Sequence, residues 1–413
     1  MKALTEFVSS HLNEDTTRLL LARSKWPEID MDLVVNCIES RRKLKGKVQE
    51  WYDIPELIFP ARLSAEQCSS SATASYKSAL AESILKDCRI ADLTGGFGVD
   101  SWFFSKKASK VLYNEMQEVL CKAAEMNFRT LQVGNIEISN HAVGNEDNQT
   151  SPSDILKEFA PDIVYMDPAR RGEGGKKVFL IEECTPDVLT LKDEIFCICR
   201  HMLIKLSPMA DITMACERLG ASCREVHVVA TGGECKELLI WMDREWKGEY
   251  SIHAVELPAN YPNSEPADFP FLPSEEKAAI GSTEGAESGT FLFEPGKALM
   301  KAGAYSLISE RFGIAKLGKS THYYTFSSEN TINELYGLGK IYRVISCEPL
   351  DKRTIKAAGM KYPKAEVTAR NIPMDTDTLR KKLGITSGDD AHIFGLKSDR
   401  HGNLLLCTDR VFK

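Results

Sequence analysis

Residues 88–100 read Cys-Arg-Ile-Ala-Asp-Leu-Thr-Gly-Gly-Phe-Gly-Val-Asp, and this stretch decides the expected fold. A short apolar strand ends in Asp92, a glycine-rich turn follows, and a helix begins near Asp100. Glycines at positions 95, 96 and 98 allow a tight turn that brings the backbone close to a ligand, whose polar groups then meet the helix N-terminus. The stretch therefore predicts a site for a nucleotide-like molecule.

Two nucleotide-binding motifs do not fit this turn. The dinucleotide pattern G-x-G-x-x-G would start at Gly96, but its last position is Ser101, which disfavours NAD and FAD. The turn also lacks the pattern G-x-x-x-x-G-K-[ST], so a phosphate cradle of the ATPase kind is not expected here.

Two further strands also end in an acid. The strand at residues 110–115 ends in Glu115, 17 residues after Gly98. This is near the ~20-residue spacing at which an acid binds the ribose hydroxyls in doubly wound folds. A third strand begins at Ile136, and the fourth, at 162–167, ends in Asp167. Because the carboxyl ends of parallel strands meet at one edge of the sheet, Asp92, Glu115 and Asp167 are expected to converge on one crevice.

This layout resembles that of class I S-adenosylmethionine-dependent methyltransferases over roughly residues 65–245. The form Asp-x-x-x-Gly-x-Gly at 92–98 is found in many nucleic-acid methyltransferases. The longer string at 92–100 is similar to the D-x-T-A-G-x-G-x-D loop of a bacterial small-subunit ribosomal RNA guanine-N2 methyltransferase family. The resemblance implies S-adenosylmethionine as the cofactor. The expected cofactor-binding residues are Asp92, Thr94, Gly95, Gly96, Gly98, Val99, Asp100, Glu115, Met116 and Asp167.

The pair Asp167-Pro168 resembles the start of the [DNS]-P-P-[YFW] signature of amino methyltransferases acting on bases. The chain departs from that signature, because Ala169 replaces the second proline and Arg170 replaces the aromatic residue. We expect a catalytic set of Asp167, Pro168 and Arg170, in which Asp167 and the Pro168 carbonyl accept hydrogen bonds from an amino group. The expected substrate-binding residues are Arg170, Arg171 and Lys205.

The two arginines are expected either to stack on a flipped base or to clamp a phosphate, and a structural salt bridge is the alternative. Methylation of a base carbon through a covalent adduct is disfavoured. Uracil-C5 methyltransferases need a cysteine after the fifth strand, and this chain has Ser207 there.

Charge is distributed unevenly along the 413 residues, whose formal net charge is −7. Residues 300–413 hold 19 Lys and Arg against 12 Asp and Glu, whereas residues 1–299 hold 33 against 47. Such asymmetry is typical of a nucleic-acid-binding module joined to a catalytic one, and a solvated basic face is the alternative.

The remaining composition indicates a reduced, cytoplasmic protein. The 12 cysteines include no C-x-x-C pair and form no disulfide framework. The eight histidines do not cluster with cysteine or aspartate at ligand spacings, so no metal site is expected. There is no signal-peptide core and no run near ~18 apolar residues, so no membrane association is expected.

The chain is expected to form four parts in an α/β fold. Residues 1–63 read as an N-terminal helical region. Residues 64–257 read as a seven-stranded, doubly wound (Rossmann-like) methyltransferase domain, whose first helix begins at a Ser64–Gln67 capping box. Residues 258–341 read as a linker rich in Pro, Ser, Gly, Glu and Ala and an intermediate α/β region. Residues 342–413 form a small α/β domain.

This last part resembles the small THUMP-like domain found behind such methyltransferase domains in bacteria. THUMP domains bind structured RNA in tRNA-modifying enzymes, so the resemblance implies RNA as the partner. The sequence thus predicts a methyltransferase that modifies a nitrogen of a base in ribosomal or transfer RNA. The alternatives are a methyltransferase for a small molecule or a protein, and a non-catalytic protein that binds S-adenosylmethionine and RNA.

Overall fold

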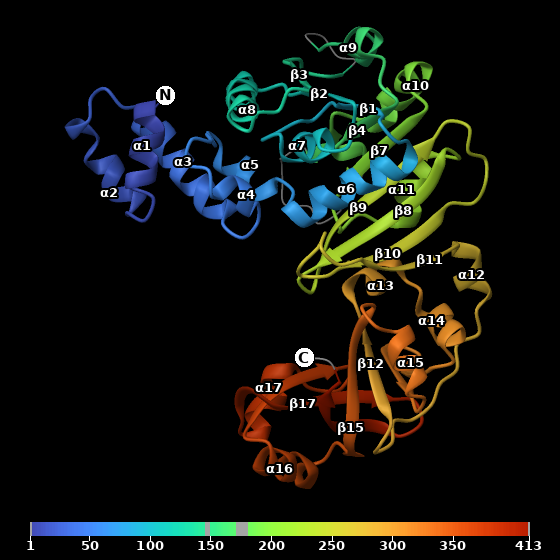
Figure 1. The fold of residues 1–413 in the computed structure, drawn as a ribbon. Coiled ribbons are helices and arrows are strands. Elements are labelled where there is room, and N and C mark those ends of the chain that lie inside the picture. Colours follow the sequence, from blue (N-terminus) through green and yellow to red (C-terminus); the bar gives the residue numbers. More distant parts are fainter. Residues whose placement is uncertain (1, 145–148, 171–180, 412–413) are drawn as a thin grey trace. The chain divides into compact units, whose positions relative to one another are not determined.

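The computed structural model describes residues 2–144, 149–170 and 181–411 (Figure 1). These residues form two compact units. The first unit comprises Met1–Val226 and Lys236–Glu249, and the second comprises His227–Cys235 and Tyr250–Lys413.

The first unit begins with a group of short helices, drawn in blue in Figure 1. They are α1 (Lys2–Ser10), α2 (Thr16–Leu21), the 3-10 turn η1 (Arg23–Lys25), α3 (Met31–Leu44), α4 (Gln49–Tyr52) and α5 (Arg62–Gln67). Asp15 and Asp30 cap α2 and α3 by accepting backbone N–H bonds, which explains where these helices start. The Asn127 side chain exchanges two hydrogen bonds with the Ile58 backbone and so anchors this group to the helix that carries Asn127.

Seven strands of the large sheet contribute to the first unit. They are β1 (Arg89–Asp92), β2 (Lys110–Asn114), β3 (Ile136–Ser139), β4 (Ile163–Met166), β7 (His201–Leu206), β8 (Cys223–Thr231) and β9 (Glu234–Asp243). Neighbouring pairs from β3 through β2, β1 and β4 to β7 are parallel, and β9 runs antiparallel to β7. The sheet was expected to have seven strands. Among the described residues it has nine, since β10 (Ser251–Leu257) and β11 (Ala267–Phe271) also belong to it, and the order is β11-β10-β8-β9-β7-β4-β1-β2-β3.

Helices alternate with these strands, as a doubly wound sheet requires. They are α6 (Ser71–Ile84), α7 (Val99–Ser105), α8 (Glu118–Thr130), α9 (Pro152–Phe159), the 3-10 turn η2 (Ile181–Glu183), α10 (Val188–Ile198) and α11 (Ile212–Leu219). A separate two-stranded ribbon consists of β5 (Ala169–Arg170) and β6 (Cys184–Thr185). The predicted helix start at Ser64 is wrong: α5 ends at Gln67, and the capping box that opens α6 is formed by Ser70 and Thr73.

The glycine-rich turn between β1 and α7 has the conformation that its sequence predicts. Gly98 adopts φ +84° at the N-cap of α7, a left-handed conformation that favours glycine. Gly95 lies against the ring of Tyr113, where a Cβ atom would come within 2.2 Å of a ring carbon. The turn therefore needs glycine at one position for its backbone angle and at another for packing.

The second unit adds β10 (Ser251–Leu257) and β11 (Ala267–Phe271), which pair antiparallel, and then forms its own sheet. This sheet has the order β13-β14-β12-β15-β18-β17-β16 among the described residues. Its strands are β12 (Phe291–Pro295), β13 (Ala315–Gly318), β14 (Thr321–Phe326), β15 (Gly339–Pro349), β16 (Lys364–Arg370), β17 (Thr386–Ser398) and β18 (Gly402–Arg410). The helices of this unit are α12 (Pro273–Ala278), α13 (Lys297–Ala302), α14 (Tyr305–Phe312), α15 (Asn330–Glu334), α16 (Lys352–Lys361) and α17 (Thr376–Leu383).

Helices α16 and α17 pack closely together in the second unit. A Cβ atom on Gly359 of α16 would come within 1.9 Å of the Leu383 carbonyl oxygen at the end of α17. Buried residues of both helices, including Ile355 and Leu379, form one core with Val367 of β16 and Ile393 of β17. The two helices thus form one layer against this end of the sheet.

One segment of the second unit matches a phosphate-binding pattern in sequence but not in structure. Residues 313–320 read G-I-A-K-L-G-K-S, which satisfies G-x-x-x-x-G-K-[ST]. The pattern needs a loop between a strand and a helix, whereas these residues form β13 and the turn to its antiparallel neighbour β14. The segment therefore lacks the geometry of a phosphate cradle.

None of the helices in the described part of the chain combines the length and apolar character that crossing a membrane would require.

Candidate active site

A pocket of about 620 Å³ lies in the first unit where β1, β2, β4 and β7 end. Its size is in the range typical of small-molecule and cofactor sites. The predicted site residues that line it are Thr94, Gly95, Gly96, Val99, Asp100, Glu115, Met116, Asp167, Pro168 and Lys205. The strand ends thus bring together most of the residues that the sequence indicates.

Asp92 does not line the pocket but lies below it, with 1% of its surface exposed. Its carboxylate accepts hydrogen bonds from Ser101 Oγ at 2.6 Å and from the backbone N–H of Thr94 at 3.0 Å. Burial raises the pKa of Asp92 to about 7, although the Ser101 hydroxyl opposes this shift. Asp92 therefore fixes the glycine-rich turn from beneath.

Glu115 reaches the turn from the end of β2. One of its carboxylate oxygens accepts the Gly96 N–H at 2.9 Å, and the other accepts the Gln117 N–H at 2.8 Å. The next residue, Met116, is 62% exposed and lines the same pocket. The carboxylate predicted to bind a ribose thus lies at the pocket wall, held by two backbone donors.

Asp167 is fixed by contacts from two directions. Its backbone N–H donates to Thr94 Oγ1 at 2.7 Å, and its side chain forms an ion pair with Lys205. Burial alone would lower the pKa of Lys205, but the neighbouring carboxylates, with Asp167 first among them, raise it above its ordinary value. Lys205 is therefore held as a cation beside Asp167.

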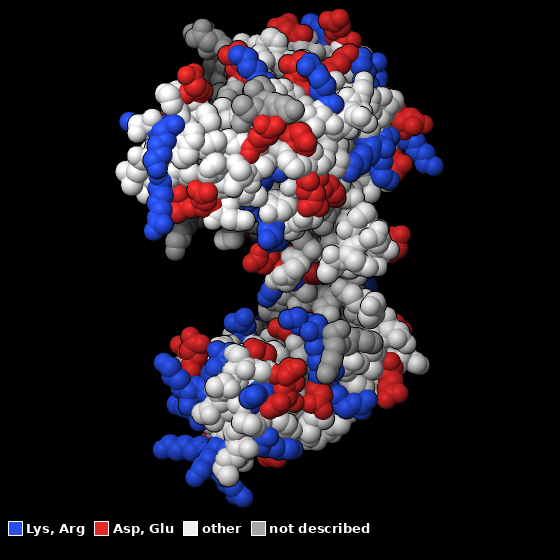
Figure 2. Space-filling view, turned by 60° about the vertical axis from the view of Figure 1, so that its left-hand side comes forward, with Lys and Arg blue, Asp and Glu red and all other residues white. Residues whose placement is uncertain are grey.

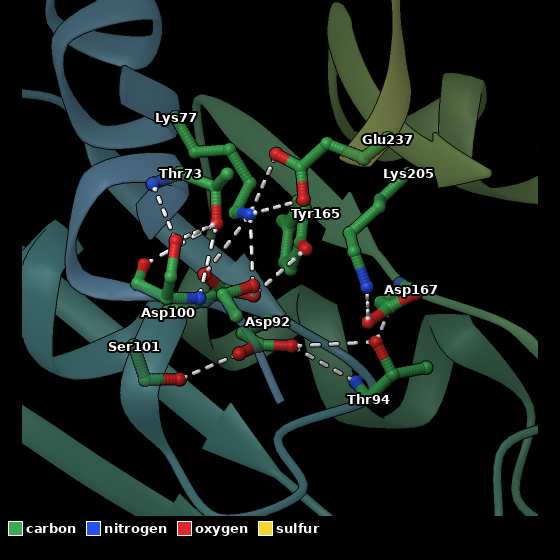
Figure 3. Close-up of polar contacts among 12 residues, drawn as sticks. Thr73, Lys77, Asp92, Thr94, Asp100, Ser101, Tyr165, Asp167, Lys205 and Glu237 are labelled. Carbon is green, nitrogen blue, oxygen red and sulfur yellow. Dashed lines mark hydrogen bonds and ion pairs between the residues drawn. The ribbon is translucent and has the colours of Figure 1, made fainter. Parts of the chain in front are cut away.

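A buried charge network, which the sequence analysis missed, lies next to these residues (Figure 3). Lys77 of α6 is fully buried and donates to both carboxylate oxygens of Glu237 and to Ser69 Oγ, each at 2.9 Å. Its ammonium also lies 3.3 Å from Asp100 Oδ1. The hydroxyls of Ser69 and Tyr165 donate to Asp100 Oδ2 at 2.9 and 3.0 Å. This network holds Asp100 at the pocket.

Two sequence signals could have revealed this network. Lys77 stands among the buried positions 73, 74, 78, 80 and 81 of α6, so it occupies the core face of that helix. Glu237 is an acid at the start of the apolar run Leu-Leu-Ile-Trp-Met of β9. Lysine and glutamate are almost never fully buried without a partner. A lysine and a glutamate that both occupy core positions are therefore expected to pair with each other.

Three predicted site residues remain: Gly98, Arg170 and Arg171. Gly98 is the N-cap of α7 and does not line the pocket. Arg170 lies in β5, where its backbone pairs with Cys184 of β6. Arg171 and the glycine-rich loop after it lie outside the described residues.

Pocket-lining residues that sequence reasoning did not assign come from several segments. They include Cys68 and Ser69 before α6, His141, Ala142 and Val143 after β3, and Ser207 and Pro208 after β7. These segments carry no motif, and only the parallel strand order places them at the same edge. Two histidines that are distant in the sequence also lie together: in the second unit, the rings of His227 and His253 stack with centroids 4.5 Å apart.

Comparisons with known proteins agree with this geometry. A solved structure of a proposed methyltransferase from Porphyromonas gingivalis W83 is 28% identical and superposes with a TM-score of 0.85, covering 99% of this chain and 98% of that chain. Two family models match the second unit: a ferredoxin-like domain at residues 291–334 and a THUMP domain-like model at residues 339–410. Among curated proteins, no match was found.

More distant structures include a proposed methyltransferase from Escherichia coli and a ribosomal RNA methylase from Streptococcus thermophilus. They are 15% and 13% identical, cover 42% and 41% of this chain and 87% and 94% of their own, and give TM-scores of 0.28 and 0.29. The expected resemblance to S-adenosylmethionine-dependent methyltransferases with a C-terminal THUMP-like domain is confirmed, and with it the enzyme class and the cofactor.

The buried carboxyl of Asp92 predicts a pH-dependent stability difference. Its pKa of about 7 in the folded state exceeds the ordinary 3.8, so the folded state keeps a proton that the unfolded state releases. The resulting stabilisation is full below pH ~4 and is lost as the pH rises through 7, a change of at most roughly 4 kcal/mol. In Asp92→Asn the loss is absent, so the melting temperature of the variant should rise relative to that of the wild type between pH 5 and pH 8. A constant difference across this range would contradict the assignment.

Proposed function

We propose that this methyltransferase transfers the methyl group of S-adenosylmethionine to a nitrogen of a base in RNA. The observation that carries the proposal is the pocket at the strand ends, where Glu115, Asp100 and Asp167 surround the glycine-rich turn. These three acids suit the three tasks of such a site: binding the ribose, binding the amino acid part of the cofactor and orienting the nucleophile.

The pocket residues fit the cofactor. Glu115 offers charged acceptors for the ribose hydroxyls next to the Gly96 backbone. The buried oxygen Asp100 Oδ1 accepts no hydrogen bond from the described residues, although Lys77 lies near it. The ion pair with Lys77 leaves this oxygen without a hydrogen bond, and the α-ammonium group of the cofactor would donate one. Thr94, Gly95 and Val99 would line the rest of this subsite.

The charges around the pocket suit a positively charged methyl donor. The sulfonium group of S-adenosylmethionine makes its methyl group a strong electrophile, so the protein mainly supplies positioning and electrostatic complementarity. The carboxylates of Asp100, Glu237 and Asp167 outnumber the two cations Lys77 and Lys205 in this network. The excess of negative charge favours a cation in the pocket.

Asp167 and Pro168 are the residues proposed to hold the nucleophile. Thr94 Oγ1 fixes the Asp167 backbone, so the carboxylate and the Pro168 carbonyl have defined positions at the pocket wall. Both groups accept hydrogen bonds and can orient an N–H group of a base so that the nitrogen lone pair points toward the methyl group. Arg170 and Arg171 follow directly and remain proposed substrate contacts.

The proposal of RNA as the substrate rests on the second unit. Its C-terminal part matches a THUMP domain-like model, and α16 and α17 carry exposed basic residues. These are Lys352, Arg353, Lys356, Lys361, Lys381 and Lys382. In Figure 2 lysine and arginine side chains project at the bottom of the view, where α16 lies. Such a cluster favours contacts with phosphates.

Replacing Glu115 should weaken cofactor binding. Glu115→Ala removes charge-assisted hydrogen bonds to the ribose, which predicts a loss of about 1.5–3 kcal/mol, or roughly 10- to 150-fold in the dissociation constant measured by calorimetry. Glu118→Ala is the matched control, because Glu118 is an exposed acid three residues away that pairs with Lys122. Equal affinities in the folded Glu115 and Glu118 variants would rule out this role.

Methyl transfer to RNA tests the function itself. With methyl-labelled S-adenosylmethionine, the protein should label RNA from a strain that lacks its gene, and Asp167→Ala should lower the rate at least ~100-fold because the nucleophile is no longer oriented. RNA from the parent strain is the control, since its sites are already methylated. Label in a protein or small-molecule fraction alone would favour the alternative substrates, and cofactor binding without any transfer would favour a non-catalytic protein.

The basic helix α16 should contribute to the salt dependence of RNA binding. Removing residues 342–413 is not a clean test, because the cut falls inside β15, which pairs with β12. We therefore expect Lys352→Gln/Arg353→Gln/Lys356→Gln to make the log–log salt slope less negative by about 2, at ~0.7 per phosphate contact. Lys122→Gln/Arg129→Gln/Lys157→Gln, on exposed positions of the first unit, is the matched control. An unchanged slope in the α16 variant would exclude this helix as an RNA contact.

A further inference from the structure

Asp167 and Lys205 lie side by side at the pocket wall because β4 and β7 are parallel neighbours. Their register pairs Met166 with Ile204, so the next residues, Asp167 and Lys205, also lie opposite each other. The ammonium of Lys205 donates to Asp167 Oδ2, and the two side chains remain 14% and 32% exposed, respectively. Both line the pocket. A substrate here meets an acceptor and a cationic donor next to each other.

Lys205 is suited to stabilising negative charge and not to accepting a proton. A protonated amine has three donors and no acceptor. The carboxylates of Asp167 and Glu237 favour this charged form, since Glu237 comes from the adjacent strand β9 and adds to the effect of the ion pair. The only proton acceptor of the pair is therefore the Asp167 carboxylate.

Bases differ in whether a cation helps their methylation. The exocyclic amino group of adenine or cytosine reacts as a neutral nucleophile, and a cation at the conjugated ring nitrogen would draw electron density away from it. The ring nitrogen of a lactam, as in guanine or uracil, reacts only after it loses its proton. The resulting negative charge is shared with the neighbouring carbonyl oxygen. An acceptor beside a cationic donor serves the second reaction.

We propose that the base methylated by this protein is a lactam, guanine or uracil, and that the methyl group goes to its ring nitrogen. The inference rests on the proposed function and names its substrate class. Asp167 accepts the N–H proton while Lys205 donates to the carbonyl oxygen. The N–H electron pair stays on nitrogen and forms the N–CH3 bond. The C–S bond breaks with its pair going to sulfur, which cancels the sulfonium charge, and Asp167 later releases its proton to water.

The identity of the product tests this inference separately from the function. RNA labelled with the methyl donor is digested to nucleosides, and the label is assigned by mass spectrometry. We expect it in 1-methylguanosine or 3-methyluridine. Label in an exocyclic amino group, as in N6-methyladenosine, N4-methylcytidine or N2-methylguanosine, would overturn the lactam inference and leave the proposed function standing. Absence of label from RNA would overturn both.

A second readout needs no turnover. The 5′-monophosphates of 6-thioguanosine and 4-thiouridine change their near-ultraviolet absorbance when the ring N–H ionises. With an excess of full-length protein, the ionisation midpoint should lie at least one pH unit lower for the wild type than for Lys205→Met, a tenfold effect. Lys205→Arg keeps the charge and should resemble the wild type. Equal midpoints for the wild type and the folded Lys205→Met variant, with both analogues, would contradict the role of Lys205.

Discussion

The site depends on one constraint, which is that charged side chains can be buried only if each has a partner. Lys77 meets this constraint for Glu237 and Asp100, and it thereby joins α6, β9 and α7 beneath the pocket. Removing one member would leave an uncompensated buried charge, which typically costs 3–5 kcal/mol. The same network keeps Asp100 facing the pocket and adds to the negative potential around Lys205. The position of Asp100 is thus a consequence of this pairing.

The two units have different features: the first contains the pocket, and the second contains the basic helix α16. The first carries the pocket, and its acids suit a cationic cofactor, but an excess of acids also repels a polyanion. The second carries the THUMP-like part, where α16 contains four basic residues and no acidic one. A substrate that bears phosphates would therefore be attracted mainly by the second unit. This division is the physical reason for proposing RNA and not a small molecule.

Much of the site could be predicted because it follows strand ends. The positions of Glu115 and Asp167 follow from two parallel strands that each end in an acid, and these residues lie at the pocket. Asp92 satisfies the same pattern, yet it lies below the turn, because the Thr94 N–H and the Ser101 hydroxyl donate to its carboxylate there. Lys77 and Glu237 were missed because 160 residues separate them, and their contact depends on how α6 packs against the sheet. The sheet was expected to have seven strands, whereas it has nine among the described residues.

The strand-end pocket is proposed to bind the methyl donor with its reactive centre at Asp167. A crystal structure of the protein with S-adenosylhomocysteine tests this most directly. The ribose hydroxyls should lie within hydrogen-bond distance of the Glu115 carboxylate, the amino group of the ligand should lie at Asp100, and the sulfur should face Asp167 and Pro168. A ligand bound outside this pocket, or one in the pocket with its sulfur facing away from Asp167, would contradict the proposed site.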